Sequence, residues 1–351
     1  MKRRLVTLHS TMRAAFAAGL MLCSLEVGLV RNADAAISTF FVPGSTATYG
    51  VSINPSGAIA GYYIDGGVYH GFVRAANGTF TTFDAPGAVS VAYALSMNPA
   101  GTITSSYVAS GMSHGFVRAA NGAFTTFDPP GSIATVAVSI NPSGAITGYY
   151  VDAFSVFHAF VRAHDGTLTT FDPPGATGTL ANSINQEGSI TGYFADAGGI
   201  HGYLRTTSGA FTTFDAALGT STLAGAINAV GEIAGNYPGP SDPVYHGFLR
   251  GRDGTITTFD APGAGTVAGG NGTFVTGINE AGAIVGSLRN YSITAGFVRT
   301  RDGTFTTVDP VALLGYSGIS ALGINPSGAI TGYVNGGIVG DPTTRGFLWI
   351  P

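Results

Sequence analysis

The chain has 351 residues and a formal net charge of −4; only 10% of its residues are charged, whereas 54 are Gly. This length permits one large β domain or two ordinary domains, and a composition rich in Gly, β-branched and aromatic residues favours short strands and tight turns over helices. The Gly residues recur periodically, which argues against a disordered chain.

The first 35 residues have the features of a secretory signal peptide. Basic residues at positions 2–4 precede an apolar stretch over residues 14–25 that is too short to span a bilayer. We therefore predict a leader over residues 1–35 and a mature chain over residues 36–351 that is secreted or periplasmic. The single cysteine, Cys23, lies in the leader, so the mature chain cannot form an internal disulfide.

The mature chain contains ten Arg, no Lys and seventeen Asp or Glu residues. A negative balance of this kind argues against binding to nucleic acid or to an anionic membrane surface. No later apolar run reaches the length of a membrane span, so we expect no transmembrane segment in the mature chain. We also expect a monomer.

One unit recurs seven times along the mature chain. Its first marker is Gly, an aromatic residue, an aliphatic residue and Arg, as in "GFVR" at residues 71–74, with Ala159 and Trp349 as single departures in the third and seventh units. Its second marker is an apolar residue followed by Asn, at Asn54, Asn98, Asn141, Asn185, Asn228, Asn279 and Asn325. Self-similarity at an almost fixed period is the signature of a repeat architecture.

Each unit reads as four antiparallel strands, named a to d here. Strand a ends at the Asn marker, and "NPSG" or "NPAG" then has the residue order of a type I turn before strand b. Strand c is "HGFVRA" in the first unit, "ANG" makes a tight hairpin, and "TFTTFD" alternates as strand d. Four strands in roughly 40–50 residues is the size of a propeller blade.

The two ends of the mature chain complement each other. "ISTFFVPG" at residues 37–44 resembles strand d without strands a to c before it, and "TRGFLWIP" at residues 344–351 stops after strand c. An open solenoid would need polar capping repeats, whereas pairing of these ends protects a strand edge. We predict a single all-β domain: a seven-bladed β-propeller with four antiparallel strands per blade, closed by pairing of the N-terminal strand with the C-terminal blade. Its last blade combines residues about 319–350 with residues 37–42.

The third unit contains "HAF" at residues 158–160, preceded by "INPSGAITGYY" at residues 140–150. These motifs resemble the extracellular HAF-repeat family of bacterial secreted proteins, and the resemblance covers nearly all of the mature chain. Among the five units that have the His, four have Gly where that family has Ala, at Gly71, Gly115, Gly202 and Gly247, and the last two units lack the His. The resemblance implies export and a repeat fold, and it implies no reaction and no catalytic residues.

The repeated polar residues suggest a scaffold. The recurring His residues lie on a ring around the axis, too far apart to share a metal ion, so we expect each to satisfy backbone groups in its own blade, with no metal and no cofactor. The recurring Asp at the end of strand d fits a turn device, and the recurring Arg fits an Asp contact between blades or a solvated face. These sets are His70, His114, His158, His201 and His246; Asp84, Asp128, Asp172, Asp215, Asp260 and Asp309; and Arg74, Arg118, Arg162, Arg205, Arg250 and Arg299.

The a–b and c–d turns stay nearly constant between units, whereas the b–c and d–a connections vary. These two variable connections emerge on one face, and binding residues usually lie on variable loops over a rigid scaffold. The largest departures fall in the last three units, where the candidate binding residues are Tyr237, Asp242, Tyr245, Arg289, Asn290, Tyr291, Asp341 and Arg345. Loop drift without function is the alternative for each of them.

The leading hypothesis is a non-catalytic secreted or cell-envelope protein that recognises a glycan, a peptide or an envelope component through this variable face. A polysaccharide or lactone-ring lyase, or a glycosidase, with a site at the axial mouth of the same face is the rival. Carboxylate chemistry has few candidates, because all three mature glutamates, Glu187, Glu232 and Glu280, fall in a–b turns on the other face. A purely structural surface protein is the third alternative.

Overall fold

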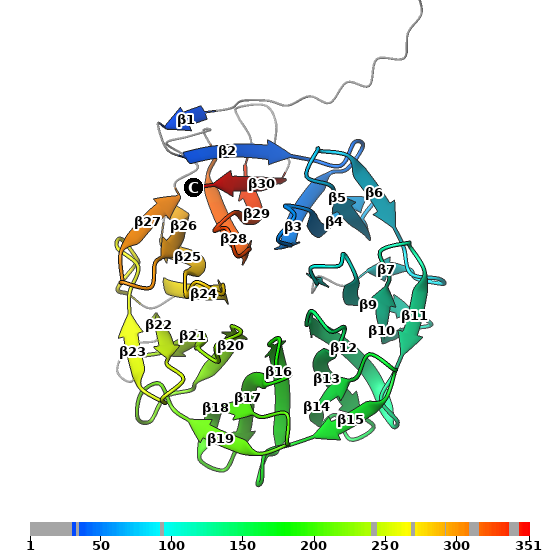
Figure 1. Cartoon of the computed structure of the whole chain (residues 1–351), viewed down its shortest axis with the longest axis vertical. Coiled ribbons are helices and arrows are strands. Elements are labelled where there is room, and N and C mark those ends of the chain that lie inside the picture. The colour runs from blue at the N-terminus through cyan, green and yellow to red at the C-terminus, as the bar shows by residue number, and fades with distance from the viewer. Residues whose placement is uncertain are drawn as a thin grey trace, which may run out of the picture.

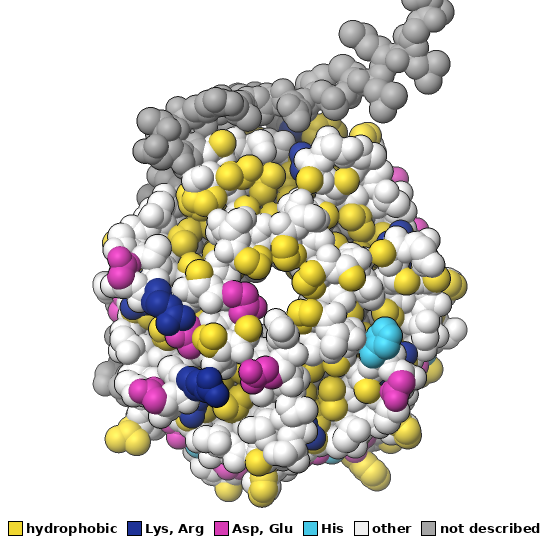
Figure 2. Space-filling view, viewed as in Figure 1, with side chains coloured by type: hydrophobic (Ala, Val, Ile, Leu, Met, Phe, Trp, Pro, Cys, Tyr) yellow, Lys and Arg dark blue, Asp and Glu magenta, His cyan; other side chains and the backbone are white. Residues whose placement is uncertain are grey.

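A computed structural model of the chain describes residues 30–32, 35–91, 95–239, 244–267, 271–291, 293–308, 316–336 and 344–351. These residues form β-strands and no helix, so none of them belongs to a helix long and apolar enough to cross a membrane. The strands are grouped around a common axis (Figure 1), and an opening remains at the centre when side chains are drawn (Figure 2). The predicted all-β, propeller-like fold is confirmed.

Each of the first four repeats supplies its own antiparallel sheet, with strands a to d in chain order from the axis outwards. In the second repeat, strand a is divided into two short strands. The bounds are β3 (Ala47–Ile53), β4 (Ile59–Asp65), β5 (Val68–Arg74) and β6 (Phe80–Phe83); β7 (Ser90–Val91), β8 (Ser96–Met97), β9 (Ile103–Ala109), β10 (Met112–Arg118) and β11 (Phe124–Phe127); β12 (Ser132–Ile140), β13 (Ile146–Asp152), β14 (Phe157–Arg162) and β15 (Leu168–Phe171); and β16 (Gly178–Ile184), β17 (Ile190–Asp196), β18 (Gly199–Arg205) and β19 (Phe211–Phe214).

The last three repeats differ from the prediction of four antiparallel strands per blade, because parallel pairs join them into one mixed sheet. Single parallel pairs, Tyr245 with Gly272 and Thr294 with Gly318, join strand c of one repeat to strand a of the next. A Cβ on Gly272 would lie 2.2 Å from the Tyr245 carbonyl oxygen, so the missing side chain permits this approach. The strands are β20 (Leu223–Ile227), β21 (Ile233–Pro238), β22 (Tyr245–Arg250) and β23 (Ile256–Phe259); β24 (Gly272–Ile278), β25 (Ile284–Asn290), β26 (Ile293–Arg299) and β27 (Phe305–Val308); and β28 (Gly318–Ile324), β29 (Ile330–Asn335) and β30 (Arg345–Ile350).

The N-terminal strand pairs with the last repeat, as the complementary ends predict. Strand β2 (Ala35–Phe40) runs antiparallel to β30, in a register from Ala36 opposite Ile350 to Phe40 opposite Gly346. A short strand, β1 (Val30–Asn32), lies within the predicted leader and pairs with the outer edge of β2. Strand β2 therefore occupies the position that strand d holds in the other repeats.

Aromatic rings connect each repeat to the next. An aromatic residue of strand c, buried to 0% exposure in five repeats, packs edge-on against the last Phe of strand d from the preceding repeat, with ring centroids 5.8–6.5 Å apart. Such edge contacts add to the free energy of apolar burial. The pairs are Phe40–Phe72, Phe83–Phe116, Phe127–Phe160, Phe171–Tyr203 and Phe214–Phe248. In the first pair, Phe40 of β2 contacts Phe72 of the first repeat in the same way as the strand d Phe contacts the next repeat in the other pairs.

The Gly of the "HGF" motif lies close to the Phe that ends strand d. A Cβ on Gly71 would lie 2.3 Å from the ring of Phe83, its partner across the β5–β6 hairpin. On Gly346 it would lie 2.2 Å from the ring of Phe40. The position also accepts Ala, because Ala159 lies opposite Phe171 in the third repeat.

The Asn markers form a chain of hydrogen bonds from repeat to repeat. Each Asn is 2–5% exposed, and its side-chain oxygen accepts backbone N–H groups of its own a–b turn, as Asn54 does from Ser56 and Ala58. In six of them the side-chain nitrogen also donates to the backbone oxygen of the Asn in the next repeat, over 3.1–3.4 Å. The steps are Asn98 to Asn141, Asn141 to Asn185, Asn185 to Asn228, Asn228 to Asn279, Asn279 to Asn325, and Asn325 back to Asn54.

Truncating Phe40 tests whether β2 completes the last repeat. We expect Phe40→Ala to lower the free energy of unfolding by about 3–5 kcal/mol, because a large side chain only 7% exposed is removed from a packed cluster. Chemical denaturation followed by circular dichroism measures the change. Ile350→Ser, at a side chain 49% exposed in the paired strand, is the control and should change stability by less than about 0.5 kcal/mol. Equal effects of the two substitutions would contradict this role of β2.

Candidate functional site

The variable connections meet on one face, named the loop face here. The start of strand a lies beside the end of strand b, as with Ala47 opposite Ile64, and the start of strand c lies beside the end of strand d, as with His70 beside Asp84. The b–c and d–a connections therefore emerge together, as predicted. The a–b and c–d turns emerge at the other ends of the strands and define the turn face.

The turn face is built from scaffold contacts. Glu232 accepts a hydrogen bond from Arg301 over 2.8 Å, and Glu280 accepts one from the backbone N–H of Ala229 over 2.7 Å. Glu187 is exposed in the turn between β16 and β17. All three glutamates thus lie in a–b turns, away from the loop face. In the view of Figure 2, acidic side chains lie beside Lys or Arg side chains on one side of the central opening.

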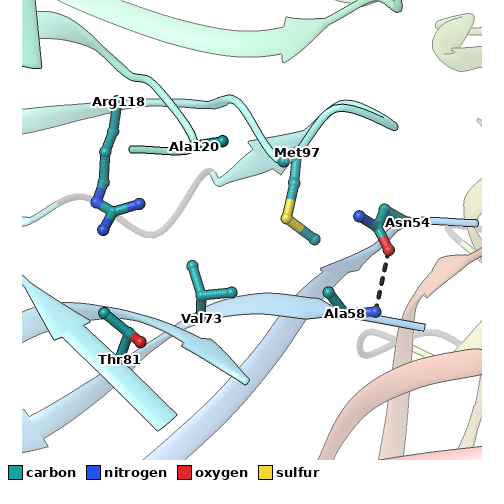
Figure 3. A pocket seen from close by; sticks show the side chains of 8 residues that line it. Asn54, Ala58, Val73, Thr81, Met97, Arg118 and Ala120 are labelled. Atoms are coloured by element: carbon teal, nitrogen blue, oxygen red, sulfur yellow. Dashed lines mark hydrogen bonds between the residues drawn. The ribbon is translucent and has the colours of Figure 1, made fainter. Parts of the chain in front are cut away.

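A cleft of about 190 Å³ lies on the turn face between the first two repeats (Figure 3). Met97 points into it and stands where the other repeats have Ile, while Val73 and Arg118 occupy repeated positions. Because its walls come from the repeated scaffold, this cleft offers little that could distinguish one ligand from another.

The five repeated histidines on the loop face pair with carboxylates. In each of the first five repeats the His Nδ1 lies 2.7–2.8 Å from the Asp that ends strand d, fourteen residues later. The prediction that His satisfies backbone groups is therefore wrong about the partner, although the contact does stay within one blade. The hairpin register contains the missed signal, because Gly71 opposite Phe83 places His70 opposite Asp84. The pairs are His70–Asp84, His114–Asp128, His158–Asp172, His201–Asp215 and His246–Asp260. Asp309 lies outside the described residues.

In the third and fourth repeats a second carboxylate, from the b–c loop, also faces the His. Nε2 of His201 lies 3.2 Å from Asp196, and Nε2 of His158 lies 3.5 Å from Asp152. The hydrogen bond to Asp215 raises the pKa of His201; burial opposes this, and the charges of both carboxylates add to the increase. The backbone N–H of Gly198 is the largest cause that lowers the pKa of Asp196. These two histidines therefore tie a b–c loop to the end of strand d most strongly when they are protonated.

The repeated arginines stack on aromatic rings, so the predicted Arg–Asp contact is wrong. Arg74 ends strand c opposite Phe80, whereas Asp84 follows the other end of strand d, so the two lie at opposite ends of the hairpin. Each guanidinium lies 4.5–5.2 Å from the ring centroid of the strand d Phe of the preceding repeat. Arg118 is 8% exposed, which also contradicts a solvated face, and burial lowers its pKa. The pairs are Arg74–Phe40, Arg118–Phe83, Arg162–Phe127, Arg205–Phe171, Arg250–Phe214 and Arg299–Phe259.

Two of the candidate binding residues occupy repeated positions. Tyr237 is 8% exposed and stacks on His246, with ring centroids 5.2 Å apart, as Tyr63 does on His70. Arg345 stands where the first five repeats have His, and its guanidinium lies 4.6 Å from the ring centroid of Phe41. Both side chains thus contribute to packing within the scaffold. Asp242 and Asp341 lie outside the described residues.

The other four candidates lie together between the fifth and sixth repeats. The ring centroids of Tyr245 and Phe274 are 5.1 Å apart. The guanidinium of Arg289 lies 4.6 Å from the ring centroid of Phe274. In the adjoining b–c loop, the Asn290 side chain donates to the Gly263 carbonyl, and Tyr291, 72% exposed, donates its backbone N–H to the Asn271 side chain. Asn271 was not among the candidates, although its role in holding two variable loops together makes it part of this surface. These contacts hold Tyr245, Phe274, Arg289 and Asn290 together as a ridge on the loop face. Tyr291 projects from this ridge.

A set of exposed apolar side chains elsewhere on the loop face was not predicted from the sequence. Phe154 in a b–c loop is 87% exposed, and Leu218 in a d–a connection is 92% exposed. The exposure of these side chains could not be predicted from their apolar character, because Ala85 and Val42, in equivalent d–a connections, are only 2% and 4% exposed. Within the described residues, no group of three or more His, Cys, Asp or Glu side chains is placed to hold a metal ion.

No protein-family model matches the sequence, and no curated protein matches it. Among solved structures, a streptogramin B lyase covers 90% of this chain and 97% of its own length, with 13% identity and a TM-score of 0.59. Virginiamycin B lyase from Staphylococcus aureus covers 91% and 100%, with 12% identity and a TM-score of 0.58. The β-propeller domain of the Trilobed protease from Pyrococcus furiosus covers 86% and 95%, with 9% identity and a TM-score of 0.60. At these identities the similarities establish a propeller-like fold alone.

The His201 pairing predicts a pH-dependent contribution to stability. A histidine pKa raised above its unfolded value of about 6.5 stabilises the fold fully below that value, and the contribution is lost as pH rises through the folded pKa. We therefore expect Asp215→Asn to lower the thermal midpoint more at about pH 5.5 than at about pH 8.5. Asp253→Asn, in a c–d turn where the acid caps Thr255, is the control and should have the same effect at both pH values. An Asp215→Asn effect that does not depend on pH would contradict the ion pair.

Proposed function

We propose that this protein is an exported, closed seven-bladed β-propeller that binds a glycan, a peptide or a cell-envelope component through its loop face. The β2–β30 pairing and the Asn325–Asn54 hydrogen bond support closure, because both connect the last repeat to residues at the start of the ring. Export rests on the basic and apolar leader over residues 1–35.

The position of the exposed apolar side chains carries this proposal. Nine of the eleven large apolar side chains that are exposed lie in or next to b–c and d–a connections of the described residues. Exposed apolar groups gathered on one face indicate an interaction surface, whereas scattered ones do not. The nine are Val68, Val89, Met112, Ile133, Phe154, Phe157, Leu218, Val267 and Tyr291; Val230 and Ile350 lie elsewhere.

The repeated contacts support a rigid scaffold that carries variable binding loops. The Asn, Phe and Arg contacts between repeats and the His–Asp pairs at the base of the loops hold the strand ends in fixed positions. A binding surface gains affinity when its supporting elements are already ordered. The loops can therefore vary in sequence while the ends that carry them stay fixed.

We also propose membership of the HAF-repeat family. The Gly residues that depart from its Ala accommodate a strand d Phe, as Gly71 does for Phe83. Arg345, which replaces His in the last repeat, keeps a ring contact of its own. These departures are compatible with the family's repeat and add no reaction to it.

The rival function is a lyase. The His–Asp pairs on the loop face are the observation that favours it. A carboxylate on Nδ1 orients an imidazole as in a general base. In the third and fourth repeats, however, Asp152 and Asp196 face the Nε2 atoms of His158 and His201. The pairs also recur in five repeats, which fits a scaffold device better than a single catalytic centre. Turnover of a polysaccharide or a lactone-containing peptide by the purified mature chain would establish the lyase instead.

A ligand screen tests the binding function. The purified mature chain is applied to a glycan array and a peptide library, and hits are mapped by hydrogen exchange. We expect protection on binding in the b–c and d–a connections, and loss of binding by at least about tenfold in Leu218→Ser, whose side chain makes few contacts of its own. Val230→Ser, on the turn face, is the matched control. Ligands that protect only the turn face would contradict the proposal.

A further inference from the structure

Charge is distributed unequally between the two faces. On the loop side of the described residues there are eight Asp and two Arg, which gives a formal charge of −6 with His neutral. On the turn side there are six acidic residues and eight Arg, a formal charge of +2. The loop-side Asp are Asp65, Asp84, Asp128, Asp152, Asp172, Asp196, Asp215 and Asp260, and the loop-side Arg are Arg289 and Arg345.

The negative charge and the exposed apolar groups coincide in one sector. Both loop-side Arg belong to the sixth and seventh repeats, so the described loop side of the second to fourth repeats carries Asp without Arg. The same sector contains Phe154, 87% exposed, and Phe157, 41% exposed, with Met112 and Ile133 at the starts of β10 and β12. The second and third repeats of this sector lie across the ring from the ridge that contains Arg289 (Figure 1).

The carboxylates of this sector remain accessible. The Asp128 and Asp172 side chains are 37% and 34% exposed although each pairs with a His. Asp152 accepts the backbone N–H groups of Phe154 and Val156, so the loop that displays Phe154 is fixed by an acid beside it. Apolar rings and negative charge are therefore presented together by one ordered loop.

We propose that the loop face of the second to fourth repeats binds a cationic, amphipathic peptide segment. This rests on the proposed binding function and specifies its partner. Basic side chains would complement the Asp, and apolar side chains would cover Phe154 and Phe157; charge complementarity of this kind favours the encounter and selects against acidic partners. An anionic membrane surface is repelled by the charge of this face, and a neutral glycan makes no use of it.

Model peptides test the proposal on the whole mature chain. The probe is a labelled amphipathic peptide of Lys and Leu, compared with one in which Glu replaces Lys and one in which Ser replaces Leu. We expect the Lys–Leu peptide to bind at least about tenfold more tightly than either, as measured by fluorescence anisotropy. Its affinity should fall as salt is raised, because exposed charges are screened.

Matched variants locate the contact. Phe154→Ser should weaken binding of the Lys–Leu peptide by about tenfold, as should Asp152→Asn, in which the amide oxygen can still accept the loop N–H groups. Val230→Ser and Glu187→Gln, on the turn face, should leave the affinity unchanged. Equal binding of the Glu–Leu peptide, unchanged affinity in both loop variants, or association of the chain with itself in place of the peptide would overturn the proposal. A neutral glycan that binds the loop face while the Lys–Leu peptide does not would refute the cationic partner and leave the binding function standing.

Discussion

The contact between successive repeats is the constraint on which the rest of the structure depends. No single sheet buries both of its faces, so each repeat needs the next. The Asn hydrogen bonds near the axis and the Phe and Arg contacts further out meet this need with the same residues each time. Because Asn141 both caps its own turn and donates to the next repeat, a change in one turn is transmitted to the contact between repeats.

This constraint decides which polar residues are available for function. The buried Asn, the Arg over aromatic rings and the His paired with Asp are each occupied by a contact that recurs around the axis. Chemistry that differs between repeats is left to the b–c and d–a connections, where Phe154, Leu218 and Tyr291 are exposed. The loop face therefore differs from the turn face in both apolar exposure and charge, although both belong to the same strands.

Periodicity in the sequence was enough to predict the strands, the Asn turns and the pairing of the chain ends, because each depends on local patterns repeated several times. The prediction of an Arg–Asp contact is wrong, because Arg118 stacks on Phe83, which belongs to the preceding repeat. The repeat pattern alone does not show which side chains of neighbouring repeats face each other. The loop prediction for Tyr237 is wrong, because its alignment with Tyr63 places it in strand b, beside His246. Loop exposure could not be predicted, since an apolar residue in a connection turns inwards or outwards according to neighbours that only the fold brings together.

Native-state hydrogen exchange tests the claim of a closed ring most directly. In a closed ring the first and last repeats have neighbours on both sides, so we expect amides of β3–β5 and β28–β30 to be as protected as those of β12–β14 and β16–β18. Removal of residues 35–40 should then lower protection in the first and last repeats together. Protection that decreases gradually from the middle repeats towards both ends of the intact chain would show an open array and contradict the account.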